Sequence, residues 1–276
     1  TLGQHTNIYQ AKNTRYTRMI MASSNYDYDL IVIGSGAGGS IAAQQVAKAG
    51  KRVAIIEAGK VGGSEVTSGR VPLSSLLQTA QVYEAVKHGG HFGIRGATIG
   101  YNYPAVKAWK DLVVKRTGIH KSEDSFIEMG INVIHGRGYF IDPHTISIGA
   151  ARFTAHEFLI ATGSEETLSQ APGLATTGFL TPREALNLTR PPKKLAILGG
   201  GSTACEIAQL LATFGTKIYL IETTPRLLAR EEPEVSSQLE TIFTQTYRMD
   251  ILFGSTIEKV EPIRAGKKIA VKSGNL

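Results

Sequence analysis

The sequence predicts an α/β fold that contains two similar units. The same order of features occurs twice: an apolar stretch rich in β-branched residues, a glycine turn, an alanine-rich stretch, and a second apolar stretch that ends in an acid. The first copy ends at Glu57 and the second at Glu222, so a constant offset of 165 residues relates their matching positions. Strands that alternate with helices in this way form parallel sheets.

The two copies place small residues at matching positions. Each begins as a strand, turns through the pattern G-x-G-x-x-G or G-x-G-x-x-A, continues as a helix to a glycine stop, and returns as a second strand. The residues that carry this pattern are Gly34, Gly36, Gly39, Gly50 and Glu57 in the first copy, and Gly199, Gly201, Ala204, Gly215 and Glu222 in the second.

Each position in this pattern has a physical role in binding a dinucleotide. The first glycine allows the tight turn, the second lets the backbone approach a pyrophosphate, and the third small residue keeps helix and strand close. The N–H groups at the start of the helix bind the phosphates. The acid accepts hydrogen bonds from the adenosine ribose and repels a 2′-phosphate. The sequence therefore predicts two Rossmann-like, three-layer ββα domains, with NADH preferred over NADPH.

The surroundings of the two copies indicate which cofactor each would hold. The first is followed by Gly62 and Gly63, and later by an apolar strand that ends in the small turn Ala161–Thr162–Gly163. Such turns can approach a large flat cofactor closely, which favours FAD in the first copy. Two nucleotide cofactors in one chain usually pass a hydride between them.

We predict three segments in the chain. Residues 1–25 form a polar N-terminal extension that is expected to be disordered, residues 26–165 an FAD-binding domain, and residues 166–276 an NAD-binding domain truncated at its C-terminus. Prolines gathered before the second copy indicate the boundary. The second domain is expected to be inserted into the first.

The composition limits the classes of molecule that the protein is expected to bind. The formal net charge is +7, but Lys and Arg are scattered, so we predict no binding of nucleic acid. No apolar run reaches the roughly 18 residues of a membrane span. A single cysteine, Cys205, is consistent with the reducing cytoplasm. We expect a cytoplasmic protein whose partner is a small-molecule electron acceptor.

With these motifs the chain resembles the flavoprotein pyridine nucleotide–disulfide oxidoreductases, the family of dihydrolipoamide dehydrogenase, glutathione reductase and mercuric reductase. The similarity runs from about Tyr26 to the end and is carried by "GSGAGG" with Glu57, "VGG", "RVP", "GYFIDPHTI", "FLIATGS", "APGL", "GGGSTACE" and "PRLLAREEPEVS". The last of these is similar to the mercuric reductase branch in particular.

The resemblance implies a set of cofactor-binding residues. For FAD these are Gly34, Gly36, Gly38, Gly39, Glu57, Gly62, Gly63, Ala161, Thr162 and Gly163. For NAD(H) they are Gly199, Gly201, Ala204 and Glu222, and Glu206 is implied where nicotinamide meets flavin. The resemblance also implies a homodimer of the full-length form, built by a C-terminal interface domain that is absent here. We interpret the chain as a fragment of a longer protein.

One segment departs from the family pattern. Relatives carry two redox cysteines five residues apart and then a lysine, whereas this chain has Glu65, Arg70 and Ser74 at these positions. Without a thiolate, disulfide exchange at this place is excluded. We considered an ion pair between Glu65 and Arg70, and a role for Arg70 as the positive charge beside Glu206.

Three functions stay open on this basis. The first is an FAD-dependent NAD(P)H oxidoreductase that passes hydride from NADH to flavin and on to a non-disulfide acceptor such as a quinone or oxygen. The second is a thiol-dependent disulfide reductase with its thiols in a missing C-terminus or on a partner. The third is a non-catalytic family member that binds FAD.

The remaining candidates have structural interpretations. Cys205 is interpreted as a small buried residue. His88 and His91 lack further ligands, so no metal site is predicted. Trp109 is expected in the core of an amphipathic helix, and Tyr101 and Tyr103 are expected to support the FAD domain. The sequence Asp142–Pro143–His144 predicts a turn between two strands.

Overall fold

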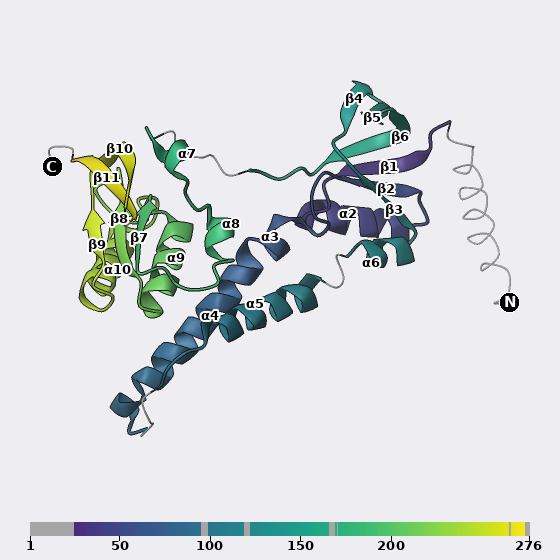
Figure 1. Cartoon of the computed structure of the whole chain (residues 1–276). Helices are drawn as coiled ribbons and strands as arrows, with labels where there is room; N and C mark the ends of the chain where they lie inside the picture. Colours follow the sequence, from purple (N-terminus) through teal and green to yellow (C-terminus); the bar gives the residue numbers. More distant parts are fainter. Residues whose placement is uncertain are drawn as a thin grey trace. The chain divides into compact units, whose positions relative to one another are not determined.

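The computed structural model describes residues 25–94, 99–118, 122–165, 169, 171–264 and 266–273. By compactness the chain divides into two units (Figure 1). Unit 1 comprises residues 1–63 and 119–164, and unit 2 comprises residues 64–118 and 165–276. The extension predicted over residues 1–25 lies almost wholly outside the described residues, which begin at Asn25.

Unit 1 contains a six-stranded sheet in the order β3-β2-β1-β6-β5-β4. The strands β1 (Tyr28–Ile33), β2 (Val53–Glu57), β3 (Ile131–His135) and β6 (Ala151–Ile160) pair in parallel. The strands β4 (Tyr139–Asp142) and β5 (Thr145–Ile148) are antiparallel, and β5 pairs antiparallel with β6. The predicted turn joins β4 to β5, where Asp142 Oδ1 accepts a hydrogen bond from the His144 N–H at 2.8 Å.

Alternation along β1 and β2 builds three layers in unit 1. Leu30 and Val32 pack on one side with Ala43 of α2 (Ala37–Lys48) and Phe126 of α6 (Glu123–Glu128). The residues between them in the sequence face the opposite side, where Ile31 packs in a second cluster formed with β2, β5 and β6. Because successive strand residues point to opposite faces, both faces of β1 are buried. The predicted α/β class with a parallel sheet is confirmed.

Unit 2 contains a smaller parallel sheet in the order β7-β8-β9, with bounds Lys194–Leu198, Lys217–Ile221 and Asp250–Leu252. An antiparallel hairpin of β10 (Ser255–Ile263) and β11 (Gly266–Ser273) follows. Its helices are α7 (Leu174–Thr177), α8 (Pro182–Ala185), α9 (Ser202–Thr213) and α10 (Pro233–Gln245).

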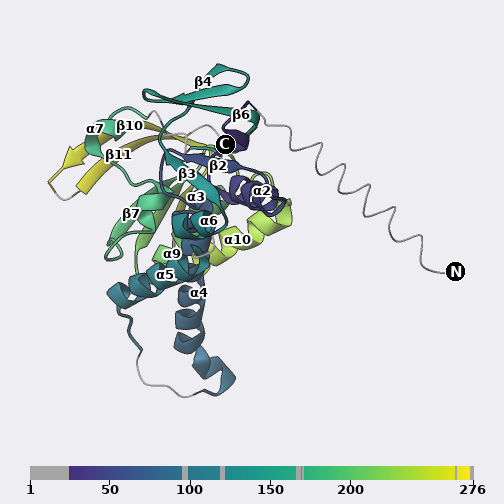
Figure 2. The ribbon, with the colours of Figure 1, turned by 90° about the vertical axis from the view of Figure 1, so that its right-hand side faces the viewer.

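Two longer helices, α4 (Arg70–Lys87) and α5 (Tyr103–Gly118), belong to unit 2 and lie side by side (Figures 1 and 2). The short helix α3 (Gly63–Thr67) and the 3-10 turn η1 (Gly89–Phe92) flank α4. Leu73 and Leu76 of α4 share one core cluster with Leu210 and Leu211 of α9. Compactness therefore groups residues 64–118 with the second glycine motif, while the predicted domain boundary at residue 165 stays a prediction.

The aromatic residues of α5 and its approach differ from expectation. Tyr101 and Tyr103 were expected to support the FAD domain, but both contact Phe214 of unit 2, and the Tyr101 hydroxyl donates to the Phe214 carbonyl at 2.7 Å. The prediction that Trp109 lies in the core is wrong, because its side chain is 49% exposed. The buried stripe of α5 is formed by residues 103, 106 and 110, and Trp109 lies about a quarter turn away from it.

Across the ranges that the structure describes, no helix is both long and apolar enough to cross a membrane.

Candidate nucleotide-binding sites

The two glycine turns have the same backbone geometry. Gly34 and Gly199 both have φ +104. The Gly34 N–H donates to the Ile56 carbonyl at 2.8 Å, and the Gly199 N–H donates to the Ile221 carbonyl at 2.9 Å. The helices that follow, α2 and α9, each contain 12 residues and begin at matching positions. The same backbone hydrogen bond therefore forms in both units, between residues that are 165 positions apart in the sequence.

Both helices begin at a position suited to an anion. Gly36 and Gly201 are their N-cap residues, and in both cases no side chain caps the helix and no acid lies in the first turn. The N–H groups of a first helical turn carry a partial positive charge and need acceptors. A pyrophosphate supplies such acceptors, so both helix starts fit the phosphates of a dinucleotide.

In unit 1 a second glycine segment lies against this helix start. A Cβ atom added at Gly63 would be 2.4 Å from the Gly36 Cα, so only glycine fits at this contact. The Gly62 N–H donates to the buried Ser35 hydroxyl at 2.9 Å. The structure thus brings Gly62 and Gly63 to the first glycine turn, as the predicted FAD site requires.

The acid that ends β2 is held against the same turn. Oε2 of Glu57 accepts hydrogen bonds from the Ser35 N–H at 2.9 Å and the Ser35 hydroxyl at 2.5 Å, while Oε1 accepts from the Gly59 N–H at 2.8 Å. Partial burial raises the pKa of Glu57, but these hydrogen bonds outweigh burial and lower the pKa below its ordinary value. The carboxylate is therefore charged at neutral pH and able to accept from a ribose hydroxyl.

The small turn after β6, Ala161–Thr162–Gly163, also lies beside the first glycine turn. The Ala161 N–H donates to the Ile33 carbonyl at 2.8 Å, and a Cβ atom added at Gly34 would be 2.3 Å from the Ala161 carbonyl oxygen. That added atom would also be 3.2 Å from the Thr162 Cα. By contrast, Gly38 faces open space, with nothing within 4 Å of an added Cβ.

Sequence reasoning missed Ser35, which connects Glu57 to the second glycine segment. It is fully buried, with 0% exposure, although serine is usually found at the surface. The available signal was its place between two glycines of the turn, within reach of the acid that ends the second strand. Its role depends on a contact between residues far apart in sequence, which a motif search does not test.

In unit 2 the acid Glu222 repeats the arrangement of Glu57. One carboxylate oxygen accepts from the Gly200 N–H, and the other accepts from the Thr224 N–H at 2.7 Å and the Thr223 hydroxyl at 3.0 Å. Gly200 is the counterpart of Ser35. Burial raises the pKa of Glu222, but the hydrogen bonds, led by the Thr224 N–H, lower it overall. The carboxylate stays charged in a buried place.

Arg70, which occupies the position of the second family cysteine, forms an ion pair. Nη1 of Arg70 lies 3.6 Å from Oε1 of Glu206. The ion pair considered between Glu65 and Arg70 is not formed among the described residues. Glu65 lies in α3 and Arg70 begins α4, and Ser68 and Gly69 separate the two helices. Arg70 is therefore the ion-pair partner of Glu206, and a role for its charge near a bound flavin stays a prediction.

Cys205 is buried on α9, as expected. Its thiol donates to the Gly200 carbonyl at 3.5 Å. Burial, followed by the nearby carboxylates of Glu222 and Glu206, raises the pKa of Cys205 to about 11. The thiol is therefore protonated at neutral pH and is a poor nucleophile.

This raised pKa predicts slow alkylation. At pH 8 we expect iodoacetamide to modify Cys205 in the folded protein roughly 100-fold more slowly than in the unfolded chain, whose thiol pKa is near 8.5. Mass spectrometry of quenched time points measures both rates, and the same chain in denaturant is the control. Equal rates would contradict both the burial and the protonation of the thiol.

The described residues contain no group of three or more His, Cys, Asp or Glu side chains that could hold a metal. His88 and His91 stack on each other with ring centroids 5.8 Å apart, and His88 Nε2 lies 3.0 Å from a Glu84 carboxylate oxygen.

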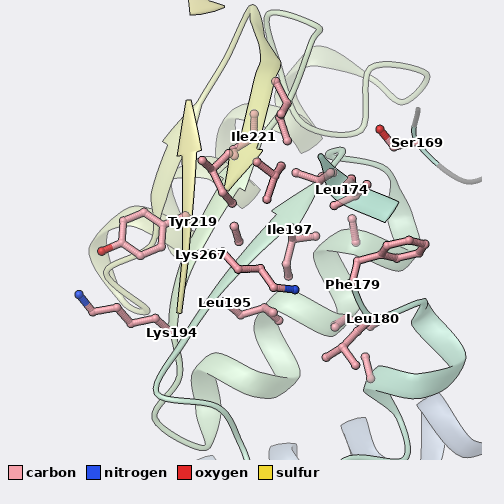
Figure 3. Close-up of a pocket in the computed structure, with 18 of the residues that line it drawn as sticks. Ser169, Leu174, Phe179, Leu180, Lys194, Leu195, Ile197, Tyr219, Ile221 and Lys267 are labelled. Atoms are coloured by element: carbon pink, nitrogen blue, oxygen red, sulfur yellow. The ribbon is translucent and has the colours of Figure 1, made fainter. Parts of the chain in front are cut away.

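A large pocket of about 1130 Å³ lies in unit 2 (Figure 3). It is lined mainly by apolar residues of β7, β10, β11 and α9. Of the residues predicted to bind NAD, only Ala204 lines it, and neither Glu222 nor Gly199 does. This pocket is therefore distinct from the place where Glu222 meets the glycine turn.

Two glycine turns, each with a charged acid bonded to it and an uncapped helix start, define a protein with two dinucleotide-binding motifs. A family model described as pyridine nucleotide-disulphide oxidoreductase matches residues 28–275, and the chain belongs to this family.

Individual relatives agree with this assignment. A mercuric reductase from Staphylococcus aureus is 32% identical over 235 residues, which cover 85% of this chain and 43% of that protein. A dihydrolipoyl dehydrogenase from Chlamydia trachomatis is 33% identical over 260 residues, covering 91% of this chain and 55% of the relative. Among solved structures, the HOCl-induced flavoprotein disulfide reductase RclA from Escherichia coli has a TM-score of 0.76 and 27% identity, covering 90% of this chain and 54% of that one. The chain spans about half the length of these relatives.

Proposed function

We propose that the chain is the nucleotide-binding part of an FAD-dependent NADH oxidoreductase that passes electrons to a non-disulfide acceptor. FAD is assigned to unit 1 and NADH to unit 2. The observation that carries the proposal is the repeated site: two glycine turns with φ +104, each followed by an uncapped helix start and bonded to a charged glutamate. FAD, when bound, supplies the chemistry that accepts a hydride.

The residues of unit 1 fit the adenosine and pyrophosphate part of FAD. Gly36 and Gly63 approach each other so closely that neither loop has a side chain at their contact. Hydrogen bonds from Ser35 and Gly59 fix the Glu57 carboxylate beside the turn, where it is proposed to accept from a ribose hydroxyl. In this proposal Gly34, Gly39 and Ala161–Thr162–Gly163 shape the same site.

The residues of unit 2 favour NADH over NADPH. Glu222 places a negative charge where a 2′-phosphate would lie. Arg226, four residues later, is engaged elsewhere: its guanidinium donates to the Glu231 carbonyl at 2.7 Å, to the Ala229 carbonyl at 2.8 Å and to the Ser236 hydroxyl at 3.0 Å. These hydrogen bonds direct its guanidinium toward the following loop and the start of α10 rather than toward a phosphate.

The acceptor is proposed to be a small molecule such as a quinone or oxygen. Glu65 and Arg70 supply no sulfur, and Cys205 has a pKa of about 11. Disulfide exchange requires a thiolate, so these residues do not support it. As further parts of the proposal, the full-length protein acts in the cytoplasm as a homodimer.

The test uses the full-length protein loaded with FAD. We expect NADH to bleach the flavin absorbance without oxygen, and turnover with a quinone to continue after treatment with arsenite and an alkylating reagent. NADPH is the matched control for the nucleotide. A flavin that NADH leaves oxidised would contradict the proposal.

A thiol-dependent disulfide reductase is the second candidate, because a similar solved structure is described as a flavoprotein disulfide reductase. Its thiols would lie in a further part of the protein or on a partner. Loss of turnover after alkylation, with NADH-driven bleaching intact, would favour this candidate over the first.

Replacement of Arg70, the ion-pair partner of Glu206, tests its role. The Arg70 side chain is 71% exposed, so the pair with Glu206 stabilises the fold by less than about 1 kcal/mol. We expect Arg70→Ser to leave the melting temperature nearly unchanged and to slow NADH-driven flavin reduction about tenfold, because Glu206 loses its counter-charge. Stopped-flow absorbance measures this rate.

The control variant is Arg70→Ser combined with Ser74→Lys. Position 74 lies one helical turn after position 70 on α4, so a lysine there can reach the same carboxylate. We expect it to restore the rate to within about threefold of the unchanged protein. A rate insensitive to Arg70→Ser would show that the pair does not serve this step.

A further inference from the structure

The middle residue of the second glycine turn, Gly200, is held on both sides of its backbone. Its N–H donates to a Glu222 carboxylate oxygen, and its carbonyl accepts from the Leu228 N–H at 2.9 Å. In unit 1 the counterpart Ser35 connects its turn to a neighbouring segment through its own hydroxyl. Gly200 has no side chain that could do so, and the loop that contains Leu228 makes the connection instead.

This loop, residues 223–232, joins β8 to α10 and packs tightly on the turn. Leu227 is fully buried, and a Cβ atom added at Gly200 would be 2.8 Å from its Cδ2 atom. Leu228 has φ +48, and Arg248 is the only other non-glycine residue at positive φ among those that the structure describes. A leucine adopts this strained conformation where surrounding contacts hold it in place.

Arg226 supplies those contacts. Its guanidinium donates to the carbonyls of Ala229 and Glu231 and to the Ser236 hydroxyl. Ser236 is 2% exposed, and its hydroxyl donates in turn to the Leu227 carbonyl at 2.6 Å. A guanidinium carries five donors in a rigid planar group, so one side chain can hold several acceptors in fixed positions. Arg226 and Ser236 thus fix the part of the loop that includes the strained residue.

The hydrogen bonds of the loop form a closed ring that returns to the acid. Glu222 Oε1 accepts from the Thr224 N–H at 2.7 Å, and the Thr224 hydroxyl donates to the Arg226 carbonyl at 2.9 Å. From Arg226 the ring continues through Ser236 to the backbone before Leu228, whose N–H leads back to the glycine turn. The groups that orient both oxygens of the carboxylate therefore belong to one connected network.

We infer that Arg226 is a positioning residue for the nucleotide: through this ring it orients the Glu222 carboxylate and the Gly200 turn for the adenosine ribose. The inference rests on the proposed function, in which Glu222 accepts from a ribose hydroxyl. Its physical basis is that a loop ordered by its own side chains spares NADH the entropy cost of ordering it on binding. Arg226 acts from a distance, because its donors are directed to the loop and to Ser236.

Replacement of Arg226 by alanine tests the inference. The full-length protein is titrated by calorimetry with NADH and with NADPH, without oxygen and with its flavin already reduced. We expect Arg226→Ala to lower NADH affinity about tenfold and the ratio of NADH to NADPH affinity about fivefold, because Glu222 loses its fixed orientation. A purely structural role would weaken both nucleotides equally and leave this ratio unchanged.

Two matched variants separate the geometry of the side chain from its charge. Arg230→Ala removes an exposed guanidinium from the same loop and should leave both affinities within about twofold of the unchanged protein. Arg226→Lys keeps the charge but replaces the planar group by a single ammonium, so it should lower the ratio nearly as much as alanine does. It also serves for the same measurements if Arg226→Ala does not fold.

A double variant tests whether Arg226 acts through the acid. In the Glu222→Gln protein the oriented carboxylate is already lost, so adding Arg226→Ala should not change the ratio of NADH to NADPH affinity further.

Amide exchange tests the ring without any nucleotide. In Arg226→Ala we expect the peptide that covers residues 199–205 to exchange about tenfold faster, because Gly200 loses its support from the loop. Peptides from β1 in unit 1 are the internal reference and should not change, and Arg230→Ala should leave both regions as they are.

Three outcomes would overturn the inference: an unchanged ratio in Arg226→Ala, equal effects of Arg226→Ala and Arg230→Ala, or a further shift in the Glu222→Gln background. Failure of the unchanged protein to bind NADH would instead contradict the proposed function. The exchange of residues 199–205 then decides whether Arg226 positions the turn, and unchanged exchange there would overturn the inference as well.

Discussion

Alanine at Gly34 should destabilise unit 1 by about 3–5 kcal/mol, whereas alanine at Gly199 should cost unit 2 only about 1–2 kcal/mol. Both residues have φ +104, so the conformational cost of a side chain is the same for both. The difference comes from packing, since the new Cβ would be 2.3 Å from the Ala161 carbonyl oxygen at position 34 and would meet nothing within 4 Å at position 199.

Amide exchange read by mass spectrometry is suited to this measurement, because peptides from β1 and β7 report the two units separately. The 276-residue chain should be used for both variants. Gly50→Ala and Gly215→Ala are the matched controls, with φ of +77 and +90 and open space at both positions. These two should cost about the same. Equal losses for Gly34→Ala and Gly199→Ala would show that the Ala161 contact does not constrain the first turn.

Replacing Glu222 by glutamine should shift the ratio of NADH to NADPH affinity by on the order of 100-fold toward NADPH. A hydrogen bond to a charged group contributes about 1.5–3 kcal/mol, so loss of the carboxylate weakens binding of the ribose hydroxyl about tenfold or more. Removal of the negative charge also relieves repulsion of the 2′-phosphate, and the glutamine N–H₂ group can donate to it.

The ratio is measured by titrating the full-length protein with each nucleotide and following protein fluorescence. Glu57→Gln is the matched control, because it makes the same change in the repeated site of unit 1. It should weaken FAD binding and leave the NADH to NADPH ratio unchanged. An unchanged ratio in the Glu222→Gln variant would place the ribose away from this acid.

Much of the fold could be predicted because the glycine pattern constrains the backbone locally. Gly34 and Gly199 require a conformation that other residues rarely adopt, and the strands and helices around them show clear periodicity. The acids Glu57 and Glu222 were also identifiable, because Glu57 ends β2 and Glu222 directly follows β8, each next to the turn that it contacts. For these elements, short-range sequence carries most of the information.

The partners of side chains far apart in sequence could not be predicted. Arg70 and Glu206 meet because α4 packs on α9, which no local pattern indicates. Lys110 is 3% exposed, and its ammonium donates to the Leu186 carbonyl at 3.3 Å and the Asn187 side-chain oxygen at 2.6 Å. From the sequence alone, a lysine at that helical position would be assigned to the surface. Trp109 was wrongly expected in the core, because the sequence does not show which side of α5 packs against its distant partners.

The equivalent turns of the two units have a consequence for selectivity. Each offers the same groups to an incoming molecule: a helix start without a cap and a glutamate already bonded to its loop. AMP or ADP, which lack the flavin and the nicotinamide, should therefore compete at both places. Under the proposed function, discrimination between FAD and NADH then depends on the ring system that each carries beyond its diphosphate.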